Sequence, residues 1–246
     1  QPSKRNPFKP FVKGIKDVPF GDSSAMRRAI NKKTAMVIVE PIMGEAGVIV
    51  PPDDYLKNLR QYCDENGALL VFDCVQTGMG RTGDWFGYEY SGIRPDVITL
   101  AKGLGGGLPI GAMIAMGSAS QLFATGDHGS TFGGNHIATA AALAVISSIE
   151  KEKTLQKVDE LGILLRTELA LIPGVSEVRG AGLLIGLTLD KSVAKELVKR
   201  CQELGALINA PSASVIRLAP ALNISTAQVK KFIGIFRQAL QEVSHV

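Results

Sequence analysis

The sequence predicts an α/β fold, with a mostly parallel sheet in residues 1–152 and a small α+β unit in residues 153–246. The first observation behind this prediction is a series of short apolar runs, each typical of a buried strand. These runs are residues 36–39, 69–72, 97–100 and 112–116. The second observation is a change after about residue 153, where amphipathic helical patterns alternate with single strand-like runs.

A helix is predicted between the first two runs, and strands separated by a helix indicate a parallel pair with a crossover connection. Asp53 or Asp54 can cap the start of this helix, and Gly67 can end it. Its apolar residues repeat every three or four positions, at Leu56, Leu59 and Cys63. A second, alanine-rich helix is predicted over residues 135–150.

The later part of the chain predicts three more helices and two strands. The helices are predicted near residues 155–169, 193–204 and 226–240, and the strands over residues 183–189 and 215–218. Ser225 and Gln228 have the spacing of a capping box, which marks the start of the last helix.

The charge distribution argues against a nucleic-acid partner. The net charge is +4, but five basic and no acidic residues lie in residues 1–16, which leaves 22 basic and 23 acidic residues elsewhere. A nearly neutral remainder provides no basic face for nucleic acid. The basic start is interpreted as a solvated surface segment, with an anionic partner as the alternative.

The cysteines and the least polar stretch indicate where the protein works. Cys63, Cys74 and Cys201 are far apart and match neither a zinc site nor a disulfide framework, which favours a reducing compartment. We therefore predict the cytoplasm, or an organellar matrix in a eukaryote. The three histidines share no metal-ligand spacing, so no metal site is predicted. Residues 104–117 are too short and too rich in glycine and proline to span a membrane.

Two charged residues follow two of the predicted strands. Asp73 follows residues 69–72, and Lys102 follows residues 97–100 and opens a glycine tract. Ligands of open α/β sheets bind just outside the carboxyl ends of the strands. A lysine that forms a Schiff base and a carboxylate that pairs with a pyridinium nitrogen suit pyridoxal phosphate. The alternatives are a solvated loop lysine and an aspartate that caps a helix.

Other polar residues are expected at the same edge of the sheet. Gln76 lies three residues after Asp73, so both side chains can point into one pocket. Glu45 follows the first strand after a proline and a glycine, and Arg217 is its candidate partner. Arg81 lies in a tight glycine loop, where pinning the loop and binding a ligand are equally plausible roles.

Residues 129–135 (GSTFGGN) precede the alanine-rich helix. Hydroxyl and backbone N–H groups near a helix start can bind phosphate, which makes Ser130 and Thr131 candidates. The alternative is that one of them only caps a turn. Residues 103–107 do not fit the dinucleotide-binding or P-loop patterns.

Four segments together resemble one family. Residues 40–47 (EPIMGEAG), 73–83 (DCVQTGMGRTG), 100–111 (LAKGLGGGLPIG) and 129–135 are similar, in order and spacing, to class III aminotransferases of fold type I. Residues 179–186 (RGAGLLIG) and 216–223 (IRLAPALN) are most similar to the acetylornithine and ornithine aminotransferases of that family. The resemblance covers essentially the whole chain.

The resemblance implies a pyridoxal-phosphate enzyme that works as a homodimer with shared active sites. It would transfer the amino group of N-acetylornithine, or a similar ω-amino substrate, to 2-oxoglutarate in arginine biosynthesis. Ornithine or 4-aminobutyrate are alternative donors, an aminomutase of the same fold is a further alternative, and a non-catalytic remnant that dimerises is the alternative from another class.

The resemblance also implies a role for each candidate residue. Lys102 binds the cofactor covalently and moves the proton, and Asp73 keeps the ring nitrogen protonated. Val75 packs on the ring, and Gln76 contacts the ring hydroxyl. The remaining implied roles are phosphate contact across the dimer for Ser130 and Thr131, and a substrate-responsive pair for Glu45 and Arg217.

The sequence departs from the family pattern in two ways. Cys74 stands where the family usually has a glutamate, which removes a carboxylate beside the site. The chain also resembles only the later part of the family. No counterpart precedes Glu40 for the phosphate-binding glycine loop, the stacking aromatic residue or the substrate arginine. We therefore expect this chain to be inactive alone and to need a separate N-terminal segment.

Overall fold

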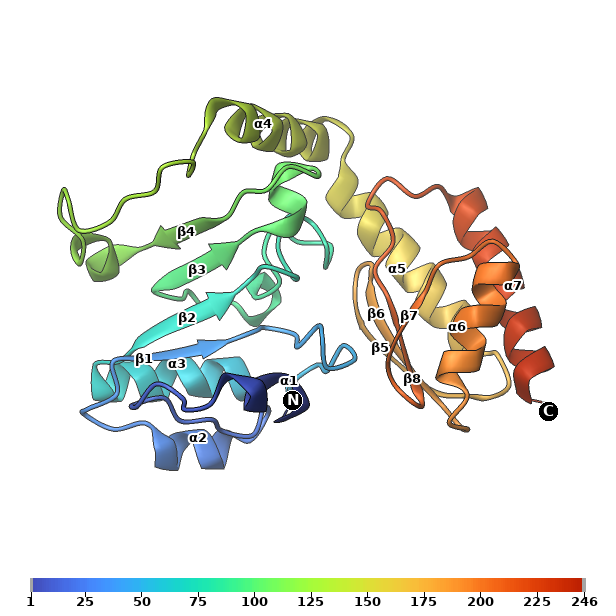
Figure 1. Cartoon of the computed structure of the whole chain (residues 1–246), viewed down its shortest axis with the longest axis horizontal. Coiled ribbons are helices and arrows are strands. Elements are labelled where there is room, and N and C mark those ends of the chain that lie inside the picture. Colours follow the sequence, from blue (N-terminus) through green and yellow to red (C-terminus); the bar gives the residue numbers. More distant parts are fainter. Residues whose placement is uncertain (1, 245–246) are drawn as a thin grey trace.

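The computed structural model describes residues 2–244 and contains two sheets (Figure 1). The first sheet has the order β1-β2-β3-β4, formed by Met36–Val39, Leu69–Asp73, Val97–Leu100 and Ala112–Ala115. The pairs β1–β2 and β2–β3 are parallel, whereas β4 runs antiparallel to β3. The predicted mostly parallel sheet is therefore confirmed.

The helix between β1 and β2 is also confirmed. It is α3, Tyr55–Asn66, and Gly67 ends it in the left-handed conformation with φ of 71°. Asp54 occupies the predicted cap position, but its side chain accepts a hydrogen bond from Asn58 and does not cap the backbone. The other helices of this part are α1 Pro2–Arg5, α2 Ser23–Ala29 and α4 His136–Lys151, with short 3-10 turns at Asn6–Phe8, Glu89–Ser91, Lys102–Gly105 and Gly117–Gln121.

The second sheet is antiparallel throughout and has the order β5-β6-β8-β7. Its strands are β5 Val175–Ala181, β6 Leu184–Leu189, β7 Asn209–Ser212 and β8 Val215–Leu218. Its helices are α5 Thr154–Ala170, α6 Ala194–Glu203 and α7 Thr226–Ser244. The predicted capping box starts α7, because Ser225 Oγ accepts from the Gln228 N–H at 3.2 Å and Gln228 Oε1 accepts from the Ser225 N–H at 2.9 Å.

Strands β5 and β7 were not predicted. The side chains of β5 are exposed or half-buried along its whole length, so it lacks a clear alternation of apolar and polar residues. Strand β7 contains Pro211, which cannot donate to a ladder and is confined to sheet edges, and β7 is indeed an edge strand.

Each sheet packs into its own hydrophobic cluster. The buried residues of the first cluster come from residues 26–149, and those of the second come from residues 158–240. The division into domains at residues 152 and 153 stays a prediction. In Figure 1 the strands β1, β2 and β3 point toward the second sheet, so their carboxyl ends face it.

Within residues 2–244, no helix combines the length and hydrophobicity needed to cross a bilayer. The same residues contain no group of three His, Cys, Asp or Glu side chains placed to hold a metal ion. His245 lies outside the described residues.

Candidate active site

Asp73 is the last residue of β2 and lies opposite Thr99 of β3. Its Oδ1 atom accepts hydrogen bonds from the Val75 N–H at 3.0 Å and from Thr99 Oγ1 at 3.2 Å. These two contacts fix the half-buried carboxylate at the edge of the sheet. Its second oxygen, Oδ2, accepts no hydrogen bond from residues 2–244, so it is available to a ligand.

Lys102 lies two residues beyond the end of β3, where the Lys102–Gly105 turn begins. Its φ of 47° is in the left-handed region, which is uncommon for a residue other than glycine. Such conformations cost about 1–3 kcal/mol and cluster at functional sites. In the described part of the chain the Lys102 ammonium has no ion-pair partner within 4.0 Å. The strained turn thus presents an unpaired amine at the strand end.

A third charged group, Glu40, follows β1 directly. Its Oε2 accepts the Gly44 N–H at 3.0 Å. Burial raises the pKa of Glu40, the Asp73 carboxylate raises it further, and the Lys102 ammonium opposes both. Glu40 therefore lies within electrostatic range of both Asp73 and Lys102. Glu40 was not among the predicted site residues, although it follows β1 as Lys102 and Asp73 follow their strands.

Replacing Glu40 by glutamine is expected to stabilise the chain at neutral pH. Because folding raises the pKa of Glu40 above 4.5, the folded state binds more protons than the unfolded state between 4.5 and the raised value. Stability from this group is therefore present below pH 4.5 and is lost as pH rises. Glu40→Gln keeps an acceptor for the Gly44 N–H and removes the buried charge. Thermal unfolding should show a higher midpoint for the variant at about pH 7, and no such gain at about pH 4. A lower midpoint at neutral pH would contradict this.

The predicted partner of Glu45 is indeed Arg217, which lies on β8. Arg217 Nη1 donates to Glu45 Oε2 at 2.6 Å, and it also lies 3.5 Å from the Gly44 carbonyl oxygen. Lys4 Nζ contacts the other carboxylate oxygen of Glu45 at 3.1 Å. The hydrogen bond from Arg217, followed by that from Lys4, lowers the pKa of Glu45. The pair therefore joins the turn after β1 to the second sheet.

Gln76 connects this pair to the strand end that carries Asp73. Its Oε1 lies 3.5 Å from Arg217 Nη1, which is at the limit of a hydrogen bond. A Cβ atom on Gly44 would lie only 2.5 Å from the same oxygen, so glycine leaves room for the amide. Gln76 thus lies between the Glu45–Arg217 pair and Asp73.

Arg81 pins its loop, which is one of the two roles left open by the sequence. Its Nη1 donates to the carbonyl oxygens of Pro220 at 2.6 Å and Leu183 at 3.2 Å, both in the second half of the chain. Burial lowers the pKa of Arg81 to about 10. Cys74 is also buried, and burial raises the pKa of its thiol to about 12, so it adds no charge beside Asp73.

Ser130 and Thr131 lie apart from the other candidates. Ser130 Oγ accepts the Gly133 N–H at 3.0 Å. Ser130 and Thr131 are both exposed. The segment between β4 and α4 extends toward the end of the sheet opposite the carboxyl ends of β1, β2 and β3 (Figure 1). No hydrogen bond among residues 2–244 joins these two side chains to Lys102 or Asp73. Their contact with a cofactor phosphate stays a prediction.

The chain is similar in sequence to curated proteins that carry one name. The acetylornithine aminotransferases of Streptomyces coelicolor and Mycobacterium leprae are each 47% identical to it over 99% of its length. The chain spans 61% and 62% of the length of these two proteins.

Solved structures of aminotransferases also match the chain. The acetylornithine aminotransferase of Elizabethkingia anophelis matches 94% of the chain with a TM-score of 0.88 and 34% identity, and 63% of its own length is covered. An ornithine aminotransferase of Toxoplasma gondii with partial occupancy of PLP matches the whole chain with a TM-score of 0.93 and 31% identity, and 60% of its own length is covered. The profile of the family "Aminotransferase class-III" matches residues 4–240. The chain therefore belongs to the class III aminotransferases.

Proposed function

We propose that this chain is part of a pyridoxal-phosphate-dependent aminotransferase that takes N-acetylornithine as donor and 2-oxoglutarate as acceptor. The products would be the semialdehyde and glutamate, as a step of arginine biosynthesis in the cytoplasm. The names of two curated relatives, both acetylornithine aminotransferases, support the donor. The observation that carries the proposal is the edge where, within residues 2–244, Lys102 has no ion pair and Asp73 keeps one unbonded oxygen.

The residues at this edge fit pyridoxal phosphate. When bound, the cofactor supplies an aldehyde that combines with amines and a ring that withdraws electrons. Lys102 Nζ would hold the aldehyde carbon and then move a proton at the substrate carbon. Asp73 Oδ2 would hold a proton at the ring nitrogen, since Oδ1 already accepts two hydrogen bonds. Val75 would pack on the ring face, and Gln76 would contact the ring hydroxyl.

Arg217 would bind the carboxylate of glutamate or 2-oxoglutarate. Its side chain is 18% exposed, whereas that of Glu45 is 53% exposed, so Glu45 is the partner with room to move away. Glu45 would cover Arg217 while the ω-amino donor is bound and release it for the dicarboxylate. While the Glu45 carboxylate lies 2.6 Å from Arg217 Nη1, it also competes with other anions for the guanidinium.

The proposed enzyme is a homodimer with shared sites, in which Ser130 and Thr131 contact the cofactor phosphate of the neighbouring subunit. Their exposure supports a role toward a second copy. Ornithine is the second candidate donor, because the ornithine aminotransferase of Toxoplasma gondii matches the whole chain in structure. Parallel assays with acetylated and free ornithine distinguish the two.

Borohydride reduction tests the proposal. With pyridoxal phosphate present, reduction should attach the cofactor to the peptide that contains Lys102, as read by mass spectrometry. Lys102→Gln should lose this label, whereas Lys153→Gln should keep it. Lys153 is a matched control because it is another lysine with positive φ, at 51°. Label on a different lysine, or none when every other segment of the enzyme is supplied, would reject Lys102 and the function built on it.

A further inference from the structure

Three residues of the second sheet form a row on one face, directly beneath the turn that carries Glu45. Arg179 of β5 pairs with Gly186 of β6, and Gly186 pairs with Arg217 of β8. Cross-strand partners project from the same face of a sheet. The row therefore consists of two guanidinium groups on either side of a residue that has no side chain.

The backbone of the Glu45 turn, residues 44–48, fills the gap above the glycine. A Cβ atom on Gly186 would lie 2.5 Å from the Gly47 carbonyl oxygen and 3.0 Å from the Val48 Cβ. Any larger residue at position 186 would displace the turn, since a backbone carbonyl cannot rotate away as a side chain can.

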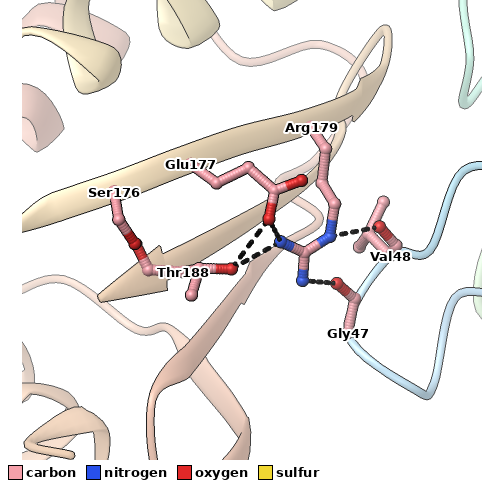
Figure 2. A network of polar contacts seen from close by, with 6 residues as sticks. All are labelled: Gly47, Val48, Ser176, Glu177, Arg179 and Thr188. Carbon is pink, nitrogen blue, oxygen red and sulfur yellow. Dashed lines mark hydrogen bonds and ion pairs between the residues drawn. The ribbon is translucent and has the colours of Figure 1, made fainter. Parts of the chain in front are cut away.

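Arg179 holds the same backbone from the side (Figure 2). Its Nε donates to the Val48 carbonyl oxygen at 2.9 Å, and its Nη2 donates to that of Gly47 at 2.8 Å. Its Nη1 donates to Glu177 and to Thr188 Oγ1, both at 2.7 Å, which fixes the plane of the guanidinium. All three nitrogens are thus engaged, and the side chain is only 17% exposed.

The turn needs such support because its backbone is strained. Val48 has φ of 59° although it is β-branched, and its side chain is fully buried. Val48 and Ile42 pack against Leu184 of β6. A β-branched residue persists in the left-handed region only where its surroundings over-determine the conformation.

We propose that Arg179 is a positioning residue that fixes the backbone of the Glu45 turn on the second sheet, with Gly186 providing the space. Glu45 then moves on and off Arg217 by rotation of its side chain alone. Glu45 lies two residues before Gly47, so the bond from Arg179 limits any shift of its backbone. The catalytic meaning of this arrangement rests on the proposed function, whereas the contacts do not.

Hydrogen exchange of the whole chain tests the anchoring. Arg179→Lys keeps the positive charge, but it replaces the rigid planar guanidinium, whose Nε and Nη2 bond separately to the two carbonyl groups, with one compact ammonium on a flexible stem. The amides of Val48 and Ile49, which bond to Gly44 and Met43 within the turn, should exchange about tenfold faster or more. Amides of β2 should be unchanged. Arg166→Lys is the matched control, because Arg166 also donates to a backbone carbonyl, that of Gly182, away from the turn.

Titration of the Glu45 carboxyl group by NMR provides the second readout. In a Lys4→Gln background, where Arg217 is the remaining charged partner, Arg179→Lys should raise the pKa of Glu45 toward 4.5. Arg166→Lys should leave the pKa low. Gly186→Ala should reproduce both effects of Arg179→Lys by pushing the turn away.

Unchanged exchange in the turn, or faster exchange throughout the chain, would overturn the proposal for Arg179. A Glu45 pKa that stays low while the turn exchanges faster would overturn it too. Such a result would mean that the hydrogen bonds of Arg179 do not affect the Glu45–Arg217 pair. Both readouts need neither cofactor nor substrate. If the chain shows these effects but Lys102 is not labelled, the proposed function is rejected and the positioning role of Arg179 still holds.

Discussion

Replacing Asp73 by asparagine is expected to lower the rate of transamination on the order of 10³-fold while part of the cofactor stays bound. The amide can still accept the hydrogen bonds of Val75 and Thr99, so the strand end keeps its structure. It cannot hold a proton at the ring nitrogen, because it carries no negative charge. The loss is therefore electrostatic and falls on the transition state rather than on binding.

The measurement is kcat/KM for N-acetylornithine and 2-oxoglutarate in the complete enzyme with saturating pyridoxal phosphate. Thr99→Val is the matched control, since it removes one hydrogen bond to Asp73 and leaves the charge. It should reduce the rate by about tenfold or less. Turnover of Asp73→Asn close to that of the unmodified protein would show that Asp73 has another role.

The substitution Gly162→Ala is expected to destabilise the fold by about 2 kcal/mol. Gly162 lies in α5, where alanine would ordinarily stabilise a helix by about 1 kcal/mol. A Cβ atom here would lie 2.2 Å from the Gly182 carbonyl oxygen, which is backbone and cannot give way by changing rotamer. Gly182 itself packs on the backbone of Thr82, so the strain reaches the loop of Arg81. The clash outweighs the gain in helix propensity.

Urea unfolding measures this effect, and the chain supplies its own control. Gly234 lies in α7, and within residues 2–244 a Cβ atom there would meet nothing within 4 Å apart from its chain neighbours and its own helix backbone. The same substitution at Gly234 should raise the free energy of unfolding by about 0.5–1 kcal/mol. A Gly162→Ala variant that is stabilised as well would mean that α5 can move away from β5 and β6 without penalty.

The first sheet was predictable because its signals are local. Each of its four strands is a short apolar run, and Gly67 marks the end of the helix between two of them. The positions of Asp73 and Lys102 at the strand ends could be predicted for the same reason, since parallel neighbouring strands end at one edge. The capping box at Ser225 is another short-range signal that the structure bears out.

The features that the sequence did not reveal depend on distant partners. Strand β5 is exposed or half-buried throughout and has no clear alternation, and β7 contains a proline that is tolerated only because β7 is an edge. Arg179 looks like an ordinary strand residue until the turn at Gly47 is placed on it, 132 positions away. Nothing in the sequence around Gly186 indicates that the Gly47 carbonyl group occupies the space where a side chain would lie. Such complementarity exists only in the folded chain.

The sequence separation of these contacts also determines when the site can form during folding. The two largest hydrophobic clusters are each built from one continuous stretch of the chain, so each can collapse without waiting for the other. The bonds of Arg179 and Arg217 to the Glu45 turn join residues 131 to 173 positions apart. Closing loops of that length is slow and yields few contacts until both ends are structured. The Glu45–Arg217 pair is therefore among the last native contacts to be made, and recovery of helix and sheet content alone does not report a finished site.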